Sequence, residues 1–264
     1  MLGLAAELGA TSVVVDSSGN AGRAVAAYAA RSGLKARVYL PDSTDRLKVE
    51  AIRALGATVI EVPGGREAAA RAAVGSLGPA APHSGDEPWY ASHAFQPAFH
   101  LGVRELAFEL HEQLGEGLGT VVVPAGNGTL VMGLWLGFRA LLATGRRSEM
   151  PAIVAVQSER CAPLAGMAPA GATAAVGIAI PVPPRAGPVA AAVRASGGRV
   201  LLAAEKDLMP AQRQLREMGV DVEATAAAVW AAWALGQGPM DQAGPIQGDV
   251  VLVMTGRQPG PPGL

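Results

Sequence analysis

The sequence predicts an α/β protein built from mostly parallel, doubly wound sheets. Two observations carry this prediction. Short runs of β-branched residues alternate with longer segments of helical periodicity along the 264-residue chain. Glycine, proline and aspartate separate these segments, and no internal repeat is found. Strands that alternate with helices of this length are typical of parallel sheets with helices packed on their faces.

The predicted elements follow one another along the whole chain. The strands are expected at residues 11–16, 36–40, 58–62, 89–91, 120–124, 153–156, 199–203 and 249–254. The helices are expected at residues 1–8, 20–31, 44–55, 67–74, 97–114, 205–218 and 224–235, with two more ending near 143 and 195. Gly9 and Gly33 are typical of helix C-termini, and Pro97 suits the start of a helix. Ser43 or Thr44 is expected to cap the helix at 44–55.

Apolar residues at helical spacing indicate which helix faces are buried. In the helix at 20–31, Val25, Tyr28 and Ala29 form such a stripe. In the helix at 44–55, Leu47, Ile52 and Leu55 are expected to face inward. These faces would pack on the strands that precede and follow them.

Two domains are expected, residues 1–95 and residues 96–264, with the boundary near Phe95. The stretch 76–88 is rich in Gly, Pro and Ser and is predicted to be a loop. A second irregular stretch, rich in Ala, Gly and Pro, covers residues 161–188. The length allows one large core or two modest ones.

Composition and charge argue against several classes of partner. The net charge is −1, so neither a nucleic acid nor a membrane surface is indicated. A single cysteine, Cys161, rules out an internal disulfide framework and fits a reducing compartment. The longest apolar stretch, residues 224–235, is shorter than the roughly 18 residues of a membrane span. No signal peptide is recognised, so we expect a soluble, cytoplasmic protein.

Two glycine-containing turns, each between a strand and a helix, are the strongest candidates for binding sites. They are SSGNAG at residues 17–22 and AGNGTL at residues 125–130. Small residues at such a turn expose backbone N–H groups at the positive end of a helix dipole, where anions bind. Either turn could instead be a plain connection, with a serine cap in the first and glycine dihedrals in the second. Together the turns suit a ligand with two anionic groups, such as a cofactor phosphate and a substrate carboxylate.

Other chemistries have weaker signals. Neither turn spells Gly-x-Gly-x-x-Gly, and Glu159 lies beyond the spacing of a ribose-binding acid, so a nicotinamide cofactor is the weaker hypothesis. His83, His93, His100 and His111 show no metal-ligand spacing, so no metal is expected. No Gly-x-Ser-x-Gly nucleophile motif is present.

Five ordered motifs cover nearly the whole chain. They are SSGNAG at 17–22, GVRELAFEL at 102–110, VPAGNG at 123–128, EATAA at 223–227 and VMTG at 253–256. Taken together they resemble the pyridoxal-phosphate enzymes of the tryptophan-synthase-β fold, and threonine synthase most of all. The resemblance implies a smaller domain that carries the first turn and a larger domain that carries the second.

The resemblance also implies roles for individual residues. The residues that would hold the substrate carboxylate are Ser17, Ser18 and Gly19. The residues that would hold the phosphate of pyridoxal 5′-phosphate are Gly126, Asn127, Gly128 and Thr129. Asn20 would contact the ring hydroxyl of the cofactor. Thr255 would face its pyridine nitrogen, and a hydroxyl there leaves that nitrogen largely unprotonated.

The lysine that binds the cofactor in this family has no counterpart in these motifs. In the family this lysine precedes the serine–glycine turn, whereas Lys35 precedes a predicted strand and Lys48 and Lys206 lie in predicted helices. We expect the lysine segment, and the first part of the larger domain, to lie upstream of Met1. The alternative is a lysine-less homologue that binds ligand without catalysis.

The resemblance implies a lyase of amino-acid biosynthesis that acts on a small amino acid. The reaction would be elimination or replacement at the β or γ carbon of phosphohomoserine, or of serine or threonine. Without the lysine, the chain as written is expected to bind the cofactor with negligible turnover. A non-catalytic binding or interaction subunit is the alternative, and a nicotinamide enzyme is a distant third. The resemblance also implies a homodimer.

Overall fold

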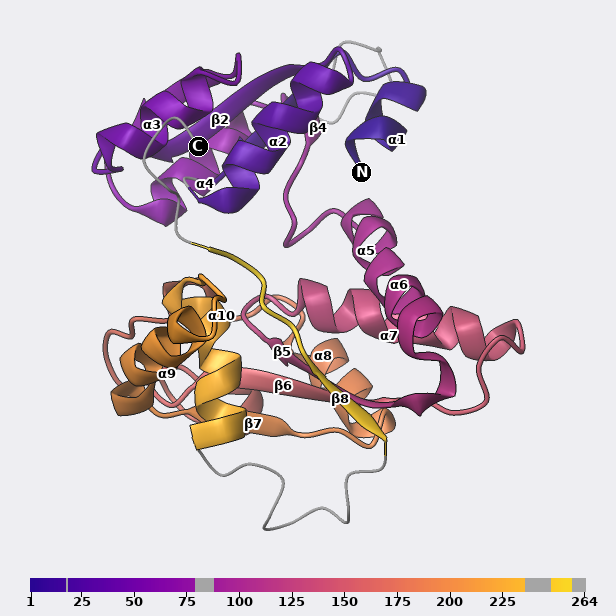
Figure 1. Ribbon diagram of the computed structural model, residues 1–264. Helices are drawn as coiled ribbons and strands as arrows, with labels where there is room; N and C mark the ends of the chain where they lie inside the picture. The colour runs from indigo at the N-terminus through magenta and orange to yellow at the C-terminus, as the bar shows by residue number, and fades with distance from the viewer. Residues whose placement is uncertain (18, 79–87, 236–247, 258–264) are drawn as a thin grey trace. The chain divides into compact units, whose positions relative to one another are not determined.

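Two four-stranded parallel sheets form the framework of the computed structural model, which describes residues 1–17, 19–78, 88–235 and 248–257. The chain divides into two units, Met1–Phe99 and His100–Leu264, and each unit holds one sheet (Figure 1). All strand pairs in the two sheets are parallel. The predicted α/β class with parallel sheets is therefore confirmed.

The first unit has the strand order β3-β2-β1-β4. Its strands are β1 (Ser12–Asp16), β2 (Lys35–Pro41), β3 (Thr58–Val62) and β4 (Trp89–Tyr90), and its helices are α1 (Leu2–Glu7), α2 (Asn20–Arg31), α3 (Arg46–Arg53) and α4 (Arg66–Gly75). Val13, Val15 and Val38 pack in one cluster with residues of α1, α2 and α3. Val14 and Tyr39 pack in another with Ala73 of α4. The two faces follow from the alternation of side chains along a strand.

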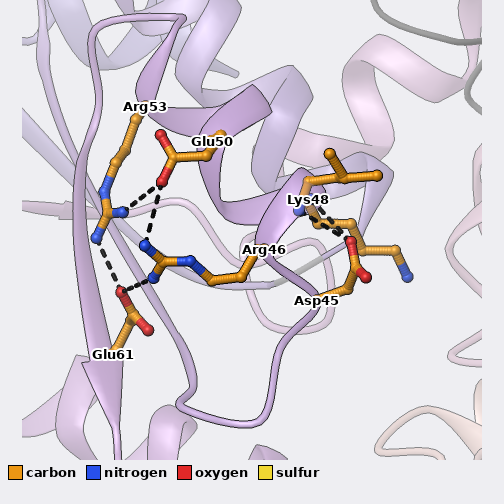
Figure 2. Close-up of polar contacts among 7 residues, drawn as sticks. Asp45, Arg46, Lys48, Glu50, Arg53 and Glu61 are labelled. Atoms are coloured by element: carbon orange, nitrogen blue, oxygen red, sulfur yellow. Dashed lines mark hydrogen bonds and ion pairs between the residues drawn. The ribbon is translucent and has the colours of Figure 1, made fainter.

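The N-terminus of α3 is capped by Asp45, and the predicted cap at Ser43 or Thr44 was wrong. Asp45 Oδ1 accepts hydrogen bonds from the backbone N–H of Leu47 at 3.0 Å and of Lys48 at 3.3 Å (Figure 2). The carboxylate accepts hydrogen bonds from N–H groups that have no partner within the helix, and its negative charge is attracted to the positive end of the helix dipole. The helix therefore begins at Arg46.

Ion pairs tie α3 to β3, the neighbouring edge strand. Arg53 lies 2.9 Å from Glu50 and 2.8 Å from Glu61, and Arg46 lies 3.7 and 3.6 Å from the same two carboxylates (Figure 2). These side chains remain partly or largely exposed, so water and salt screen the attraction. The cluster orients α3 on the sheet more than it stabilises the fold.

The second unit has the strand order β7-β6-β5-β8. Its strands are β5 (Leu118–Pro124), β6 (Ala152–Ser158), β7 (Val200–Ala203) and β8 (Asp249–Leu252). Its helices are α5 (Ala98–Val103), which crosses the unit boundary, α6 (Glu105–Leu114), α7 (Thr129–Ala143), α8 (Ala186–Ala195), α9 (Glu205–Glu217) and α10 (Ala224–Trp230), with short turns η1 (Gly115–Gly117), η2 (Pro163–Ala165), η3 (Val176–Ile178) and η4 (Ala231–Leu235). One face packs against α6, α7 and α8, and the other against α9 and α10 (Figure 1).

The helix predicted at 97–114 is broken at Arg104 into α5 and α6. At the break, the backbone of residues 103 and 104 packs closely against α7. A Cβ added to Gly137 would lie 2.6 Å from the carbonyl oxygen of Arg104 and 2.6 Å from Ala107 Cβ. A Cβ at Gly133 would lie 2.4 Å from Val103 Cγ1. The glycines of α7 thus form a groove that admits the backbone of the neighbouring helix.

A buried arginine closes the N-terminal edge of the second sheet. Arg147 is 4% exposed, and its guanidinium donates hydrogen bonds to the backbone carbonyls of Gly115, Leu118 and Glu149. The ring of Phe138 lies 5.8 Å below the guanidinium carbon. One side chain therefore satisfies carbonyls from the start of β5 and from the loop before β6.

Replacing Arg147 by methionine is expected to lower the free energy of unfolding by about 3 kcal/mol or more, because buried carbonyls lose their donors. Arg146→Met is the matched control, since the Arg146 side chain, among the residues that the structure describes, makes one exposed ion pair, with Glu112 at 3.8 Å. The control should change stability by less than about 1 kcal/mol. Urea unfolding followed by tryptophan fluorescence measures both variants. Equal losses would show that the carbonyl contacts of Arg147 add nothing to stability.

Candidate functional site

The first glycine turn lies where β1 ends and α2 begins, at the C-terminal edge of the first sheet. Ser17 and Gly19 belong to this turn, and Asn20 is the first residue of α2. Ser18 lies outside the described residues. Gly19 occupies the cap position in an extended conformation and provides no side-chain cap, although its N–H lies 3.4 Å from Ser17 Oγ. Gly19 and Asn20 are exposed at this edge.

Gly19 and Gly22 differ in how much space surrounds their Cα atoms. A Cβ on Gly22 would lie 2.0 Å from the carbonyl oxygen of Ser17, so the turn can close on the helix only without a side chain there. A Cβ on Gly19 would meet nothing within 4 Å, and its φ of −102° is open to any residue. The fold accounts for Gly22 and leaves the space around Gly19 available to a ligand.

The second turn connects β5 to α7 at the C-terminal edge of the second sheet. Gly128 is the N-cap of α7 with a φ of +77°, and it has no side chain with which to cap the helix. A Cβ on Gly128 would lie 2.1 Å from Val189 Cγ2, and one on Gly126 would lie 2.8 Å from the carbonyl oxygen of Gly177. The turn is therefore held between α8 and η3. The start of the 15-residue helix α7 offers backbone N–H groups and the positive end of a dipole.

Gln157 fixes the base of the second turn, and it is not among the site residues expected from the sequence. It is fully buried at the end of β6, where its Nε2 donates to the carbonyl of Ala125 at 3.1 Å. Its Oε1 accepts from the N–H of Leu164 at 2.9 Å. The signal in the sequence is a polar amide that directly follows the apolar run of a buried strand. Such a residue must find internal partners.

Thr255 follows β8, the strand that pairs with β5, at the C-terminal edge of the second sheet. β8 pairs with β5 in the register Val122↔Leu252, and the N–H of Val253 donates to the carbonyl of Val122 at 2.9 Å. The chain then leaves the sheet at the same edge at which β5 enters the turn. Thr255 and the turn residues Gly126, Asn127, Gly128 and Thr129 thus follow neighbouring strands at the same edge of the second sheet. The first unit brings together Ser17, Gly19 and Asn20 at the edge of its own sheet.

The three lysines occupy different places in the fold. Lys35 begins β2 and pairs with Ser12, so it lies at the sheet edge opposite the first turn. Lys48 lies in the first turn of α3, where its side chain is exposed beside Asp45 (Figure 2). Lys206 lies in the first turn of α9, which follows β7, two strands away from β5.

Glu159, the residue considered for ribose binding, has a local partner. Its Oε1 accepts the N–H of Glu205 at 2.8 Å at the start of α9. In the described ranges no cluster of three His, Cys, Asp or Glu side chains could hold a metal ion. None of the helices that the structure describes has both the length and the apolar character needed to cross a bilayer.

Comparisons with known proteins agree with this architecture. A family profile described as pyridoxal-phosphate dependent enzyme matches residues 1–256. Among curated relatives, threonine synthase of Synechocystis is 32% identical over 96% of this chain and 64% of its own length. Threonine synthase of Methanosarcina acetivorans is 29% identical over 85% of this chain and 57% of its own length. The chain therefore spans about three fifths of these relatives.

Solved structures share the fold. Serine racemase from Dictyostelium discoideum superposes with a TM-score of 0.73 at 21% identity, over 96% of this chain and 78% of that one. Threonine deaminase isoform 2 from Solanum lycopersicum gives a TM-score of 0.76 at 20% identity, over 96% and 71%. Because the family profile covers nearly the whole sequence, the chain belongs to the family of pyridoxal-phosphate-dependent enzymes.

Proposed function

We propose that the protein that carries this chain is a threonine-synthase-like lyase, which performs elimination and replacement on phosphohomoserine or a related amino acid. The observation that carries the proposal is the glycine turn at the start of α7, in a chain whose curated relatives are threonine synthases. The proposal includes a cytoplasmic location. It also includes a homodimer, which light scattering of the purified protein would test.

The residues at the second turn suit the cofactor's phosphate. Gly128 leaves the first turn of α7 without a side-chain cap, so a dianion can take that place at the positive end of the dipole. Gly126 and Asn127 remain partly exposed. Thr255, at the same edge, offers a hydroxyl for the pyridine nitrogen. When bound, pyridoxal phosphate supplies an electron sink for the carbon that bears the amino group.

The first turn suits the substrate carboxylate. Ser17 provides a hydroxyl, and the exposed Gly19 provides a backbone that a ligand can approach closely. Asn20 can offer an amide to the ring hydroxyl of the cofactor. We assign the carboxylate to residues 17–19 and the cofactor ring to Asn20 and Thr255.

The positions of Lys35, Lys48 and Lys206 support a second proposal, which concerns the 264-residue polypeptide by itself. Lys35 lies at the edge opposite the first turn, and the other two lie in helical turns beyond β2 and β7. We propose that this polypeptide binds the cofactor without covalent attachment and without appreciable turnover. A non-catalytic ligand-binding subunit of the same fold would behave in the same way.

The test compares pyridoxal phosphate with pyridoxal, which lacks the phosphate, by calorimetry on the 264-residue polypeptide. Pyridoxal phosphate should bind at least about tenfold more tightly, a difference of about 1.4 kcal/mol. Equal affinities would contradict the role of the second turn. Borohydride followed by peptide mass spectrometry should find no label on the three lysines. Phosphate release from phosphohomoserine by the protein that carries this chain separates the lyase from the non-catalytic subunit.

A further inference from the structure

An acidic residue directly precedes the first glycine turn. Asp16 is the last residue of β1, next to Ser17. Its side chain is half-buried, and none of the ion pairs found among the described residues involves it. The Cα atoms of neighbouring residues lie about 3.8 Å apart, so the charge of Asp16 is close to any anion bound at the turn. An anion site at residues 17–19 therefore needs this carboxylate to be held in a defined place.

A tyrosine of the neighbouring strand holds the Asp16 carboxylate. β4 pairs with β1 in the register Val14↔Tyr90, and the backbone N–H of Ala91 donates to the carbonyl of Val14 at 2.7 Å. Side chains two residues apart on a strand point to the same face of a sheet, so Asp16 lies on the face of Val14. There the Tyr90 hydroxyl donates a hydrogen bond to Asp16 Oδ1 at 2.7 Å. This bond joins the end of β1 to the edge strand β4.

The surroundings of Tyr90 keep this hydrogen bond in place. Tyr90 packs against the cluster of Val14, Tyr39 and Ala73, so its ring is fixed on the α4 face of the sheet. Burial raises the pKa of Tyr90, and the hydrogen bond to Asp16 raises it further, so the hydroxyl stays protonated at neutral pH. A hydrogen bond to a carboxylate is also stronger than one between neutral groups. Tyr90 therefore donates to Asp16 across the whole neutral range.

We infer that Tyr90 is a positioning residue for the substrate carboxylate, because it holds the Asp16 side chain against β4 and keeps that charge from turning toward residues 17–19. The inference rests on the proposed function, in which those residues take the carboxylate of the amino acid. Without the Tyr90 hydroxyl, the Asp16 side chain is free to change its rotamer, and its charge then opposes a bound carboxylate. The same hydrogen bond fixes the end of β1, from which the turn starts.

The first experiment measures the affinity of the protein that carries this chain for phosphohomoserine, with pyridoxal phosphate at saturation. Tyr90→Phe keeps the ring and removes only the hydroxyl, and it should weaken phosphohomoserine binding by at least about fivefold. Tyr28→Phe is the matched control, because Tyr28 is exposed on α2, and its affinity should stay within about twofold of the wild type. Both variants should keep the wild-type affinity for pyridoxal phosphate. An unchanged phosphohomoserine affinity in Tyr90→Phe would overturn the inference.

Removing the charge of Asp16 separates positioning from a loss of packing. Asp16→Asn keeps an oxygen that can accept from Tyr90, and it should bind phosphohomoserine at least as tightly as the wild type. In the double variant with Tyr90→Phe and Asp16→Asn, the released side chain carries no charge, so most of the affinity lost in Tyr90→Phe should return. A double variant that binds no better than Tyr90→Phe would refute the role of the charge. Weaker binding in Asp16→Asn alone would also overturn the inference, because it would show that Asp16 itself contacts the amino group of the substrate.

A measurement without any ligand tests the inference separately from the proposed function, which fails if the wild type binds neither pyridoxal phosphate nor phosphohomoserine. Hydrogen exchange of the backbone amides is followed by mass spectrometry in the same protein. The amides of residues 19–24 should exchange faster in Tyr90→Phe than in the wild type, and at the wild-type rate in Tyr28→Phe. The amides of residues 126–132, in the other unit, should be unchanged in both variants. If residues 19–24 exchange at the wild-type rate in Tyr90→Phe, the hydroxyl does not fix the turn and the inference is wrong.

Discussion

Replacing Gly128 by alanine is expected to weaken binding of pyridoxal phosphate by about tenfold or more, equivalent to about 1.4 kcal/mol. The added Cβ would lie 2.1 Å from Val189 Cγ2, and Val189 is only 1% exposed, so it has no room to move away. The φ of +77° adds about 1 kcal/mol of strain for a residue with a Cβ. The turn must shift, and with it the N–H groups at the start of α7.

Two further variants isolate the cause. Gly145 lies just beyond the other end of α7 with a φ of +68°, and nothing lies within 4 Å of its added Cβ. Gly145→Ala should therefore show the strain alone and leave cofactor affinity unchanged. Adding Val189→Ala to Gly128→Ala should restore part of the affinity, because it makes room for the new methyl group. If the double variant binds no better than Gly128→Ala, the contact with α8 is not what positions the turn.

The fold class and the strands could be predicted because their signals are local. β1, β5 and β6 each contain a short run rich in valine or isoleucine. The buried positions of α2 include Val25 and Ala29, as predicted. Tyr28 and Leu47 were wrongly expected to face inward, since they are 58% and 72% exposed. Tyr28 directly precedes the buried Ala29, whereas Leu47 lies between the exposed residues Arg46 and Lys48. The eight-residue helix α3 buries only Val49 and Ile52, because a short helix presents about one turn to the sheet.

The two turns could also be found in the sequence, since small residues between a strand and a helix form a local pattern. What surrounds the second turn could not. Gly128 and Val189 meet through the packing of α7 beside α8. Gln157 could be predicted in part. A polar side chain in a buried strand indicates that a hydrogen-bond partner exists, but the sequence does not show that this partner is the carbonyl of Ala125.

Replacing Gly22 by alanine is expected to destabilise the first unit by about 2 kcal/mol or more, through overpacking against a fixed atom. The added Cβ would lie 2.0 Å from the carbonyl oxygen of Ser17 and 3.0 Å from its carbonyl carbon. Backbone atoms at the end of β1 cannot rotate aside as a side chain can. Relief requires α2 to move away from the turn, which displaces Ser17 and Gly19 together.

The control is Gly3→Ala in α1, where nothing lies within 4 Å of the added Cβ. Alanine there should be neutral or stabilising by up to about 1 kcal/mol, because it favours the helix. Chemical denaturation gives the stabilities, and calorimetry with the amino acid in the presence of pyridoxal phosphate gives the affinity for substrate. If Gly22→Ala matches Gly3→Ala in both, then the first turn does not depend on close contact between Gly22 and Ser17. Gly22→Ala could instead lose affinity for the amino acid and keep its affinity for the cofactor. That result would show that the turn proposed for the carboxylate acts independently of the turn proposed for the phosphate. Each turn is positioned by a glycine in a different unit, Gly22 in the first and Gly128 in the second.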